Sequence, residues 1–448
     1  MNTLISNFKD NMERTLSKDI STQIGGSVMI KGWLHKKRLL GGLAFINVRD
    51  RSGLTQIVVE DKDEVDKLRG LQIGTVLEVT GEVVKEDRAS GGAELHQPKI
   101  TVLVPVEEAP AIEIDKPLDH KPENLDTLFE YRTVGLRNTQ EAAIFKIRGA
   151  ITRAIRNHFH ENGFTEIQTP KLLASATEGG AEVFKLDYFG QEATLAQSPQ
   201  FYKQMMVGVF ERVYEIAPVY RAEPSATTRH MTEYISVDGE MGFVDIDDIK
   251  VFLSGLITSA VDAAWGEYDV ELKRWNATKP VLTDVFPSIP MSEIHDLYEK
   301  ATKDKITDLK DLTPSEEKWI CDYAKKKFGS EAVFVTDWPA SEMKFYHKAQ
   351  ADKPEFADRF DLLFRGVEII TGSMRENRYE VVLKQLIEKA KGNPEDPGFK
   401  YFLMAMQAGM PAHGGFGMGL ERLTQKIIGL SNVKEATLFP RDINRLTP

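Results

Sequence analysis

Two segments far apart in the chain constrain its fold more than any other feature. The first, Tyr214–Met241, alternates apolar and polar residues, breaks at Glu223-Pro224-Ser225, and resumes as a second strand-like run. Alternation on both sides of such a break predicts a long β-hairpin. The second segment, Gly414–Leu423, reads GGFGMGLERL. The cationic side chains of the two segments include Arg221, Arg229, His230 and Arg422.

Taken singly, each hairpin arginine could equally form a salt bridge on a solvated ribbon. Their joint occurrence with a glycine-flanked arginine indicates something more specific. Because a guanidinium group binds phosphate oxygens bidentately, several of them together predict a site for one polyphosphate.

The length and the cysteine content limit the class of protein. With 448 residues the chain exceeds what one hydrophobic core usually serves, so we expect two domains or more. The single cysteine, Cys321, excludes an internal disulfide framework and a thiolate zinc site, and it suits a reducing compartment. The N-terminus lacks the apolar core of a signal peptide, and no uninterrupted apolar run approaches membrane-spanning length. We therefore expect a cytoplasmic protein with no membrane segment.

The formal net charge is −11, and it is unevenly distributed. Residues 1–105 contain 15 basic and 14 acidic residues, whereas the other 343 residues contain 42 and 54. An acidic chain argues against tight non-specific binding to nucleic acid, which depends on neutralising many phosphates. A local basic surface remains possible, and Lys36-Lys37-Arg38 is one candidate.

The first 105 residues predict a small β-barrel. Short strand-like segments occur at residues 28–35, 44–50, 55–60, 75–84 and 96–106, with Gly-rich or charged breaks between them and a helical insert near Glu64–Arg69. Five strands and one helix fit an OB-fold, which binds oligonucleotides across one face. By pattern alone an SH3-like barrel fits nearly as well.

Residues 106–138 read as a Pro-rich, acidic hinge of limited flexibility that precedes a second domain at residues 139–448. That domain begins with apolar residues at helical spacing, then Gly163 and a strand-like segment ending at Pro170. Alone, this order also describes a surface helix followed by an edge strand. Later alternating segments separated by helical stretches predict an α+β domain built on an antiparallel sheet. Residues 275–330 are interpreted as a variable insertion.

Taken together, these segments resemble the class II aminoacyl-tRNA synthetases. The helix, glycine, strand and proline resemble motif 1 of that class, the hairpin resembles motif 2, and the segment from Gly417 to Arg422 resembles motif 3. Over nearly its whole length the chain is similar to aspartyl-tRNA synthetases of the archaeal type. The resemblance implies an OB-fold that binds the anticodon, a class II catalytic domain, and a homodimer formed through motif 1. It also implies an ATP-dependent ligase that uses Mg²⁺ and joins L-aspartate to tRNA(Asp).

The resemblance assigns one set of residues to the amino acid. Glu178, in the loop Ala176–Ala181, would face the substrate's ammonium group, although outside this context the loop reads as a glycine turn. Lys203 and Arg375 would lie on opposite sides of the pocket. A carboxylate gains charge-assisted hydrogen bonds from two cations, whereas a carboxamide gains little. The predicted aspartate-binding residues are Glu178, Ser198, Gln200, Lys203, Arg221, Thr371 and Arg375.

The resemblance also assigns the ATP site, with Arg221 and Arg422 as the catalytic residues. Arg221 would contact the α-phosphate and the substrate carboxylate, and Arg229 and His230 would reach the distal phosphates. Tyr234 would stack on the adenine, with Arg422 on the opposite face. The predicted ATP-binding residues are Arg221, Glu223, Arg229, His230, Met231, Tyr234, Glu368, Gly419, Leu420, Glu421 and Arg422.

Magnesium prefers hard oxygen ligands and usually shares the phosphates of its substrate. The residues at matching family positions are Glu368, Thr371 and Asp361. The odd spacing of Asp361 and Glu368 would place them on opposite faces of a regular strand. Both could reach one ion only if the chain bulged or bent near Gly366. Lys344 lies one place nearer to the following aromatic pair than is usual in the family, which leaves its role open.

In the first domain the predicted anticodon-binding residues are His35, Arg38, Phe45, Gln56 and Glu94. Single-stranded RNA bases stack on aromatic faces, which suits Phe45, although by pattern alone Phe45 reads about equally well as barrel core. His35, two residues beyond Trp33, resembles relatives that charge both tRNA(Asp) and tRNA(Asn). We therefore predict an enzyme that charges both tRNAs.

Two other functions share part of the pattern. The segment Gly372–Arg375 resembles an asparaginyl-tRNA synthetase, whereas Lys203, residues 365–368 and residues 439–448 resemble the aspartyl enzymes. A catalytically silent, RNA-binding paralogue would be marked by loss of an essential side chain. The side chains to check are Arg221, Glu368 and Arg422, and all three are present.

Overall fold

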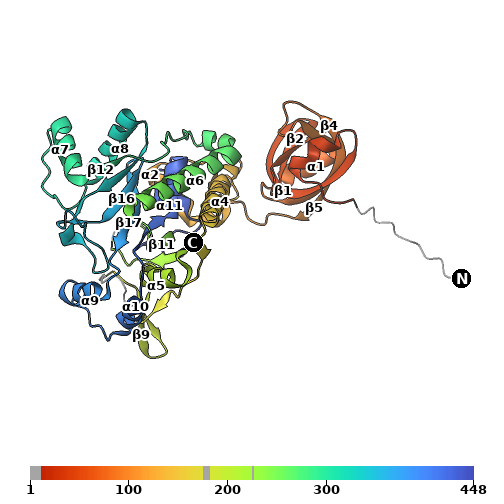
Figure 1. The fold of residues 1–448 in the computed structure, drawn as a ribbon. Helices are drawn as coiled ribbons and strands as arrows, with labels where there is room; N and C mark the ends of the chain where they lie inside the picture. The colour runs from red at the N-terminus through yellow and green to blue at the C-terminus, as the bar shows by residue number, and fades with distance from the viewer. Residues whose placement is uncertain (1–11, 175–181, 225–226, 448) are drawn as a thin grey trace. The chain divides into compact units, whose positions relative to one another are not determined.

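The computed structural model describes residues 12–174, 182–224 and 227–447. The chain divides into two compact units, Met1–Glu141 and Ala142–Pro448 (Figure 1). The first contains a closed β-barrel and the second contains a large sheet with helices. The unit boundary lies three residues beyond the first residue of the predicted second domain.

Most of the predicted hinge is folded against the start of the next helix. It contains α2 (Pro122–Glu130) and α3 (Arg132–Gly135). Apolar side chains at helical spacing on α2 pack with Ile112 in a small cluster of their own. Glu141 accepts hydrogen bonds from His120 Nε2 at 2.7 Å and from Arg132 Nη1 at 3.3 Å. These contacts attach the segment to the buried carboxylate of Glu141 in the first turn of α4.

The barrel closes in the strand order β1-β2-β3-β5-β4, with α1 (Lys62–Gly70) inserted between β3 and β4. Asp61 caps this helix by accepting from the backbone N–H groups of Asp63 and Glu64. The strands alternate buried and exposed residues, and the buried set forms one continuous core. The OB-fold prediction is confirmed. The strands are β1 (Ser27–Leu40), β2 (Leu43–Arg49), β3 (Leu54–Val59), β4 (Val76–Lys85) and β5 (Ala93–Val104), preceded by the 3₁₀ turn η1 (Ser17–Gln23).

The second unit is built on an eight-stranded sheet in the order β12-β13-β16-β17-β18-β11-β10-β6. Neighbouring strands are antiparallel, except for the pairs β12–β13 and β10–β6. The α+β prediction is confirmed. The strands are β12 (Ser288–Pro290), β13 (Ala332–Thr336), β16 (Arg359–Phe364), β17 (Val367–Arg375), β18 (His413–Gly419), β11 (Glu233–Gly242), β10 (Arg212–Tyr220) and β6 (Thr165–Glu166).

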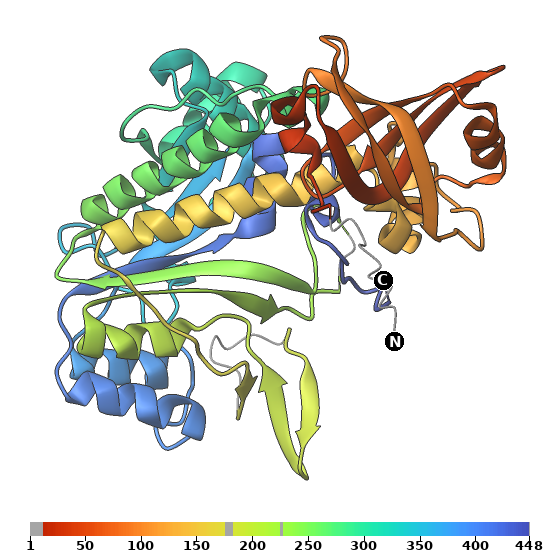
Figure 2. The ribbon, with the colours of Figure 1, turned by 90° about the vertical axis from the view of Figure 1, so that its right-hand side faces the viewer.

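Two long helices, α4 (Thr139–Glu161) and α6 (Ile246–Arg274), cover one face of this sheet (Figure 2). Phe159 of α4 stacks on Tyr214 of β10 and on Phe416 of β18, with centroids 4.1 and 6.2 Å apart. By length and composition α6 could cross a membrane, but half of its most apolar stretch is buried inside the protein. A core helix has the same composition, and α6 supplies much of the main core.

The remaining elements surround the sheet. Two small sheets contain β7 (Leu172–Leu173), β8 (Lys185–Tyr188) and β9 (Gln191–Leu195), and β14 (Trp338–Pro339) with β15 (Phe356–Ala357). The helices are α5 (Gln200–Phe210), α7 (Met291–Thr302), α8 (Pro314–Phe328), α9 (Tyr379–Glu388), α10 (Pro397–Gln407) and α11 (Leu420–Ile428), with 3₁₀ turns η2 (Ala340–Glu342) and η3 (Val433–Ala436).

The predicted insertion at residues 275–330 is integrated into the second unit. Its strand β12 pairs with β13 at the edge of the large sheet, and its helices α7 and α8 pack together. The first turn of α8 is fixed by a capping box between Thr313 and Glu316. Glu316 also accepts a bond of 2.6 Å from buried His295 of α7. The segment therefore presents α8 in a defined position.

The predicted hairpin is formed by β10 and β11, paired without interruption from Arg212↔Met241 to Tyr220↔Glu233. The glycine-rich strand β18 lies between β11 and β17, so motif 3 runs beside motif 2. Gly415 is required at this place because a Cβ there would lie 2.0 Å from Glu240 Oε2 and 2.2 Å from the Gly239 carbonyl oxygen. Polar side chains of β11 occupy the space that the glycines of β18 leave open.

Candidate active site

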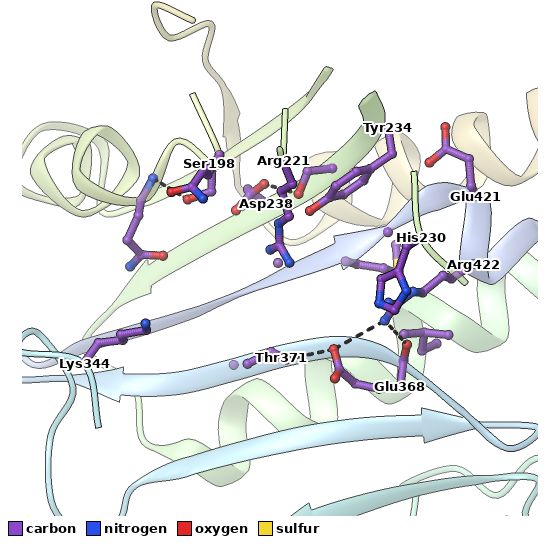
Figure 3. A pocket seen from close by; sticks show the side chains of 18 of the residues that line it. Ser198, Arg221, His230, Tyr234, Asp238, Lys344, Glu368, Thr371, Glu421 and Arg422 are labelled. Carbon is purple, nitrogen blue, oxygen red and sulfur yellow. Dashed lines mark hydrogen bonds and ion pairs between the residues drawn. The ribbon is translucent and has the colours of Figure 1, made fainter. Parts of the chain in front are cut away.

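A pocket of about 270 Å³ opens over β11, β18 and β17, and most of the predicted site residues line it (Figure 3). Leu420 and Asp361 do not line it, and Glu178 lies outside the described residues. The predicted residues that do line it are Ser198, Gln200, Lys203, Arg221, Glu223, Arg229, His230, Met231, Tyr234, Glu368, Thr371, Arg375, Gly419, Glu421 and Arg422.

One end of the pocket contains Lys203 and Arg375, which are both buried. Lys203 Nζ donates to Asp238 Oδ1 at 2.9 Å and to the Phe416 carbonyl oxygen at 2.7 Å. Arg375 donates from Nε and Nη2 to Glu240 at 2.8 and 3.1 Å. Each of the two predicted cations therefore already has a carboxylate partner within the protein.

The two carboxylates, Asp238 and Glu240, were not among the predicted site residues. Burial alone would raise the pKa of Glu240, but Arg375 and Lys203 together hold it below its usual range. A sequence signal for both does exist. Ser236, Asp238 and Glu240 alternate along β11, which places three polar side chains on one face of a central strand.

Two further groups at this end are buried and polar. Gln200 Nε2 and His347 Nδ1 have no hydrogen-bond partner among residues 12–174, 182–224 and 227–447. Burial, and then the charge of Arg375, lower the pKa of His347 well below its usual value, so this imidazole is neutral. Lys344 also lines the pocket, and Figure 3 shows its amine directed along it. This end of the pocket can therefore offer neutral hydrogen-bonding groups beside its ion pairs.

Arg221 lies between the two ends of the pocket, where Figure 3 shows it between Ser198 and Tyr234. Its guanidinium carbon is 5.6 Å from the centre of the Tyr234 ring, and Nη1 is 3.7 Å from Glu223 Oε1. Its backbone N–H donates to the Thr232 carbonyl oxygen across the hairpin loop. The hairpin therefore holds a cation at the point where two anionic substrates could meet.

The other end of the pocket gathers the remaining hairpin cations and motif 3. Arg229 Nη1 donates to Glu317 Oε2 at 2.6 Å, and His230 Nε2 lies 3.7 Å from Glu223 Oε2. Arg422 Nη1 donates to the Glu368 carbonyl oxygen at 2.9 Å and lies 3.7 Å from its carboxylate. This arrangement brings the cations predicted for a polyphosphate to one end of the pocket.

Glu368 and Thr371 lie together on β17, and Thr371 Oγ1 donates to Glu368 Oε1 at 3.1 Å. Residues three apart would face opposite sides of a regular strand. A bulge allows this contact, because the register shifts between Leu362 and Leu363 and leaves Ile369 without a partner on β16. The bulge occurs there and not at Gly366, which with Arg365 forms the turn between the two strands.

Asp361 and Glu368 lie on neighbouring strands joined by a turn at Arg365 and Gly366, so the chain does bend near Gly366, as both residues at one ion would require. Asp361 is buried and accepts two bonds from Arg359 Nη2, at 3.2 and 2.9 Å. Burial, with a contribution from Glu368, raises the pKa of Asp361 to about 7. Asp361 does not line the pocket, but it is paired with Thr371 across the two strands and therefore adjoins the Glu368–Thr371 pair, so its role at a magnesium ion stays a prediction.

Glu421 is committed to contacts within the protein. Its carboxylate accepts from Arg148 Nη2 of α4 at 2.7 Å and from the backbone N–H of Ile235. It therefore ties the motif 1 helix and the motif 2 strand to α11. Leu420 is buried at the start of α11 and belongs to the core.

On the barrel, all five predicted anticodon residues lie on strands, and four of them are paired with one another. Arg38 is opposite Phe45, and Gln56 is opposite Glu94. Gln56 Nε2 donates to Glu94 Oε2 at 2.6 Å. Phe45 is half-buried and is absent from the barrel core, which favours a surface role. Arg38 is exposed, so an aromatic ring and a cation stand side by side on the sheet.

His35 differs from the other four. It is the bulged residue where the pairing of β1 with β2 shifts register, and it is buried. Burial, and then the charge of Arg49, lower its pKa. Arg49 itself stacks over Trp33, 4.8 Å from the ring centre. His35 is therefore a packed residue of this segment and not an exposed base-stacking group.

Comparison with known proteins agrees with this geometry. Residues 124–443 match the family model for class II tRNA synthetases (D, K and N), and residues 28–103 match that for the OB-fold nucleic acid binding domain. The chain is 41% identical over 440 residues to the aspartate–tRNA(Asp/Asn) ligase of Thermus thermophilus, covering 97% of this chain and 100% of that protein. It is 38% identical to the aspartate–tRNA(Asp) ligase of Thermococcus kodakarensis, covering 96% and 99%.

Among solved structures, the asparaginyl-tRNA synthetase of Pyrococcus horikoshii in complex with asparaginyl-adenylate matches with a TM-score of 0.88 at 29% identity, covering 97% of this chain and 100% of that one. The fold, the strands of motifs 2 and 3 and the two sequence matches all point to the class II tRNA synthetases. The chain therefore belongs to the class II tRNA synthetases, in the family of the aspartate–tRNA ligases to which it is similar.

Proposed function

We propose that this protein is an aspartate–tRNA ligase, which activates L-aspartate with ATP and transfers it to tRNA(Asp). The observation that carries the proposal is the order of groups along one pocket. Arg375 and Lys203 both lie beside the Glu240 carboxylate near the C-terminal end of β17, whereas Arg422 lies beside Glu368 near the start of that strand. Figure 3 shows Arg221 between Ser198 and Tyr234, and His230 beside Arg422. Aspartate and ATP would meet at Arg221.

In the first step a carboxylate oxygen of aspartate attacks the α-phosphorus of ATP, the bond to the bridging oxygen of the β-phosphate breaks, and pyrophosphate leaves. In the second step the 3′-hydroxyl of the terminal adenosine attacks the acyl carbon and gives its proton to the departing phosphate. The bond between the acyl carbon and the phosphate oxygen breaks, and AMP leaves. In both steps negative charge is concentrated around the reacting groups in the transition state. Cations held in position stabilise that charge and so lower the barrier. Arg221 would hold the reacting carboxylate against the α-phosphate, and Arg422 would act from motif 3.

Specificity for aspartate would come from Lys203 and Arg375 acting within their ion pairs. An asparagine side chain carries no charge, so it would gain less from these cations than a carboxylate does. The buried Gln200 Nε2, a donor without a partner among the described residues, suits a bound substrate of either kind.

The proposed enzyme uses Mg²⁺. Among the described residues no group of three His, Cys, Asp or Glu side chains could hold a metal alone. Glu368 and Thr371 nevertheless present adjacent oxygen atoms at the phosphate end of the pocket, and magnesium commonly takes one or two protein oxygens together with substrate phosphates. Bound there, it would neutralise charge on the departing pyrophosphate.

Amino-acid-dependent exchange of pyrophosphate into ATP, without tRNA, tests the activity. Exchange should appear with aspartate and be lost in Arg221→Ala and in Arg375→Leu. Exchange with asparagine in place of aspartate would favour the asparaginyl alternative. No exchange with either amino acid would indicate the silent, tRNA-binding alternative.

We also propose that the enzyme charges tRNA(Asn). The Gly32–His35 segment supports this, together with the two-tRNA names of several relatives. Charging of a pure tRNA(Asn) transcript with labelled aspartate tests it directly. No product, under conditions that charge tRNA(Asp), would refute it.

A cytoplasmic homodimer completes the proposal. Val209 and Phe210 at the end of α5 and Phe243 after β11 are exposed apolar side chains, and a groove between α5 and the segment Thr165–Pro170 adjoins Phe210. Apolar surface of this kind beside an edge strand suits burial against a second copy. Sedimentation equilibrium should give a mass near twice 50.5 kDa. A monomer at micromolar concentration would contradict it.

A further inference from the structure

Arg229 is held by a residue from outside the three motifs. Its Nη1 donates to Glu317 Oε2 at 2.6 Å, and its Nη2 lies 3.4 Å from the Gly366 carbonyl oxygen. Glu317 belongs to α8, in the segment that the sequence alone marked as a variable insertion. The insertion therefore reaches the phosphate end of the pocket through one side chain.

The contact is partly shielded from water. The Glu317 and Arg229 side chains are 14% and 30% exposed, so the pair is less screened than a surface salt bridge. Glu317 also interacts electrostatically with Arg229, Glu368 and Arg422. Burial raises its pKa, Arg229 opposes that rise, Glu368 adds to it and Arg422 lowers it. Its carboxylate is thus electrostatically part of the site.

Glu317 itself is rigidly supported. It lies in the first turn of α8, directly after the capping residue Glu316, which is fixed by Thr313 and by His295. A carboxylate in the first turn of a helix is favoured by the helix dipole. A long arginine side chain loses considerable rotamer entropy when it becomes ordered. Because Glu317 already orders Arg229, less of this entropy is lost when ATP binds.

We propose that Glu317 is a positioning residue, which holds Arg229 in place to receive the distal phosphates of ATP. An arginine has five N–H donors, and the contacts to Glu317 and Gly366 use two of them. Phosphate oxygens can therefore be bound without breaking the contact to Glu317. The inference rests on the proposed function, because it assigns Arg229 to ATP.

The test is pyrophosphate exchange with full-length protein, measured as KM for ATP, KM for aspartate and kcat. In Glu317→Gln the KM for ATP should rise about tenfold, the size expected when a charge-assisted contact is lost, with the KM for aspartate within about twofold of wild type. The matched control is Asp322→Asn, an exposed acidic residue on the same helix, which should change neither value.

A double-mutant cycle separates positioning from general damage. Arg229→Ala should raise the KM for ATP at least as far as Glu317→Gln does, and adding Glu317→Gln to it should have little further effect. Glu317→Asp keeps the charge on a shorter side chain, so its KM for ATP should fall between wild type and Glu317→Gln. This variant decides the question if Glu317→Gln does not fold.

The inference is overturned if the KM for ATP is unchanged or lowered, or if the two substitutions are additive. It is also overturned if Glu317→Asp matches wild type while Glu317→Gln is unfolded. If wild type and Asp322→Asn give no exchange, the proposed function fails instead, so the two failures are distinguishable.

Discussion

Glu240 accepts hydrogen bonds from both Nε and Nη2 of Arg375, at 2.8 and 3.1 Å, in a place where both side chains are buried. Lys203 Nζ lies 3.6 Å from the same carboxylate. Lys203 and Arg375, which are predicted to bind the amino acid, therefore belong to a buried cluster of charges together with Asp238 and Glu240. The orientation of Arg375 is set by its neighbour before any substrate arrives.

Removing the charge of Glu240 should damage both stability and substrate binding. Glu240→Gln leaves Arg375 with an uncompensated buried charge, which typically costs about 3–5 kcal/mol of unfolding free energy. Urea unfolding measures this loss, and the KM for aspartate in exchange should rise as well. The control is Glu192→Gln in the exposed pair with Lys185, where the change should be about 0–1 kcal/mol. Equal effects of the two substitutions would contradict the assignment.

Gly415 should tolerate no side chain, because a Cβ would overlap Glu240 Oε2 and the Gly239 carbonyl oxygen. Gly415→Ala is expected to destabilise the protein by about 1–3 kcal/mol or more, as overpacking does. Gly266→Ala is the matched control, since nothing lies within 4 Å of a Cβ placed there on α6. That substitution should stabilise by about 0.4–1 kcal/mol. A Gly415→Ala protein with normal stability would show that β18 and β11 can move apart.

Asp361 should make stability depend on pH in the neutral range. Its pKa is about 7 in the folded protein, above the usual value of 3.8, so it contributes stability below pH 4 that is lost as the pH rises through 7. Between pH 5.5 and pH 8 the wild type should lose about 2 kcal/mol relative to Asp361→Asn. Urea unfolding of both proteins across this range measures the difference. Parallel pH profiles would mean that Asp361 stays ionised throughout.

Phe45 should act on tRNA without affecting activation of the amino acid. A base stacked on an aromatic side chain is worth about 1–3 kcal/mol, so Phe45→Ala should lower kcat/KM for tRNA(Asp) about tenfold or more. Exchange without tRNA should be unchanged. Val102→Ala, an exposed site elsewhere on the barrel, is the control and should leave charging intact. If Phe45→Ala charges tRNA(Asp) normally, Phe45 does not bind the anticodon and serves only in packing.

His35 should influence the choice between the two tRNAs. Since it is the bulged, buried residue of β1 beside Arg49, a larger side chain would reshape the nearby surface of the barrel. His35→Trp should lower charging of tRNA(Asn) while charging of tRNA(Asp) serves as the internal control for folding. An equal loss for both tRNAs would point to barrel instability and not to selection.

Local patterns in the sequence predicted most of the fold. The alternation at Tyr214–Met241 predicted the hairpin, and the segment Gly414–Leu423 was identified by its resemblance to motif 3. The five barrel strands and the helix α1 followed from the same reasoning. The pattern alone did not distinguish an OB-fold from an SH3-like barrel. The strand order distinguishes them, and it depends on pairing between distant segments.

For the site, the sequence supplied the cations and the tertiary structure supplied their partners. Arg229 and Arg375 were predicted from local motifs. The alternation along β11 carried a signal for Glu240, but its pairing with Arg375, and that of Glu317 with Arg229, were decided only by the tertiary structure. Likewise Thr371 meets Glu368 because of one unpaired residue on β17, and His35 is the buried, bulged residue of β1. Residue types and periodicity are encoded locally, so the sequence determined the elements and the chemical class of the site. Register, burial and charge pairing arise between segments distant in the chain, and only the tertiary structure decided them.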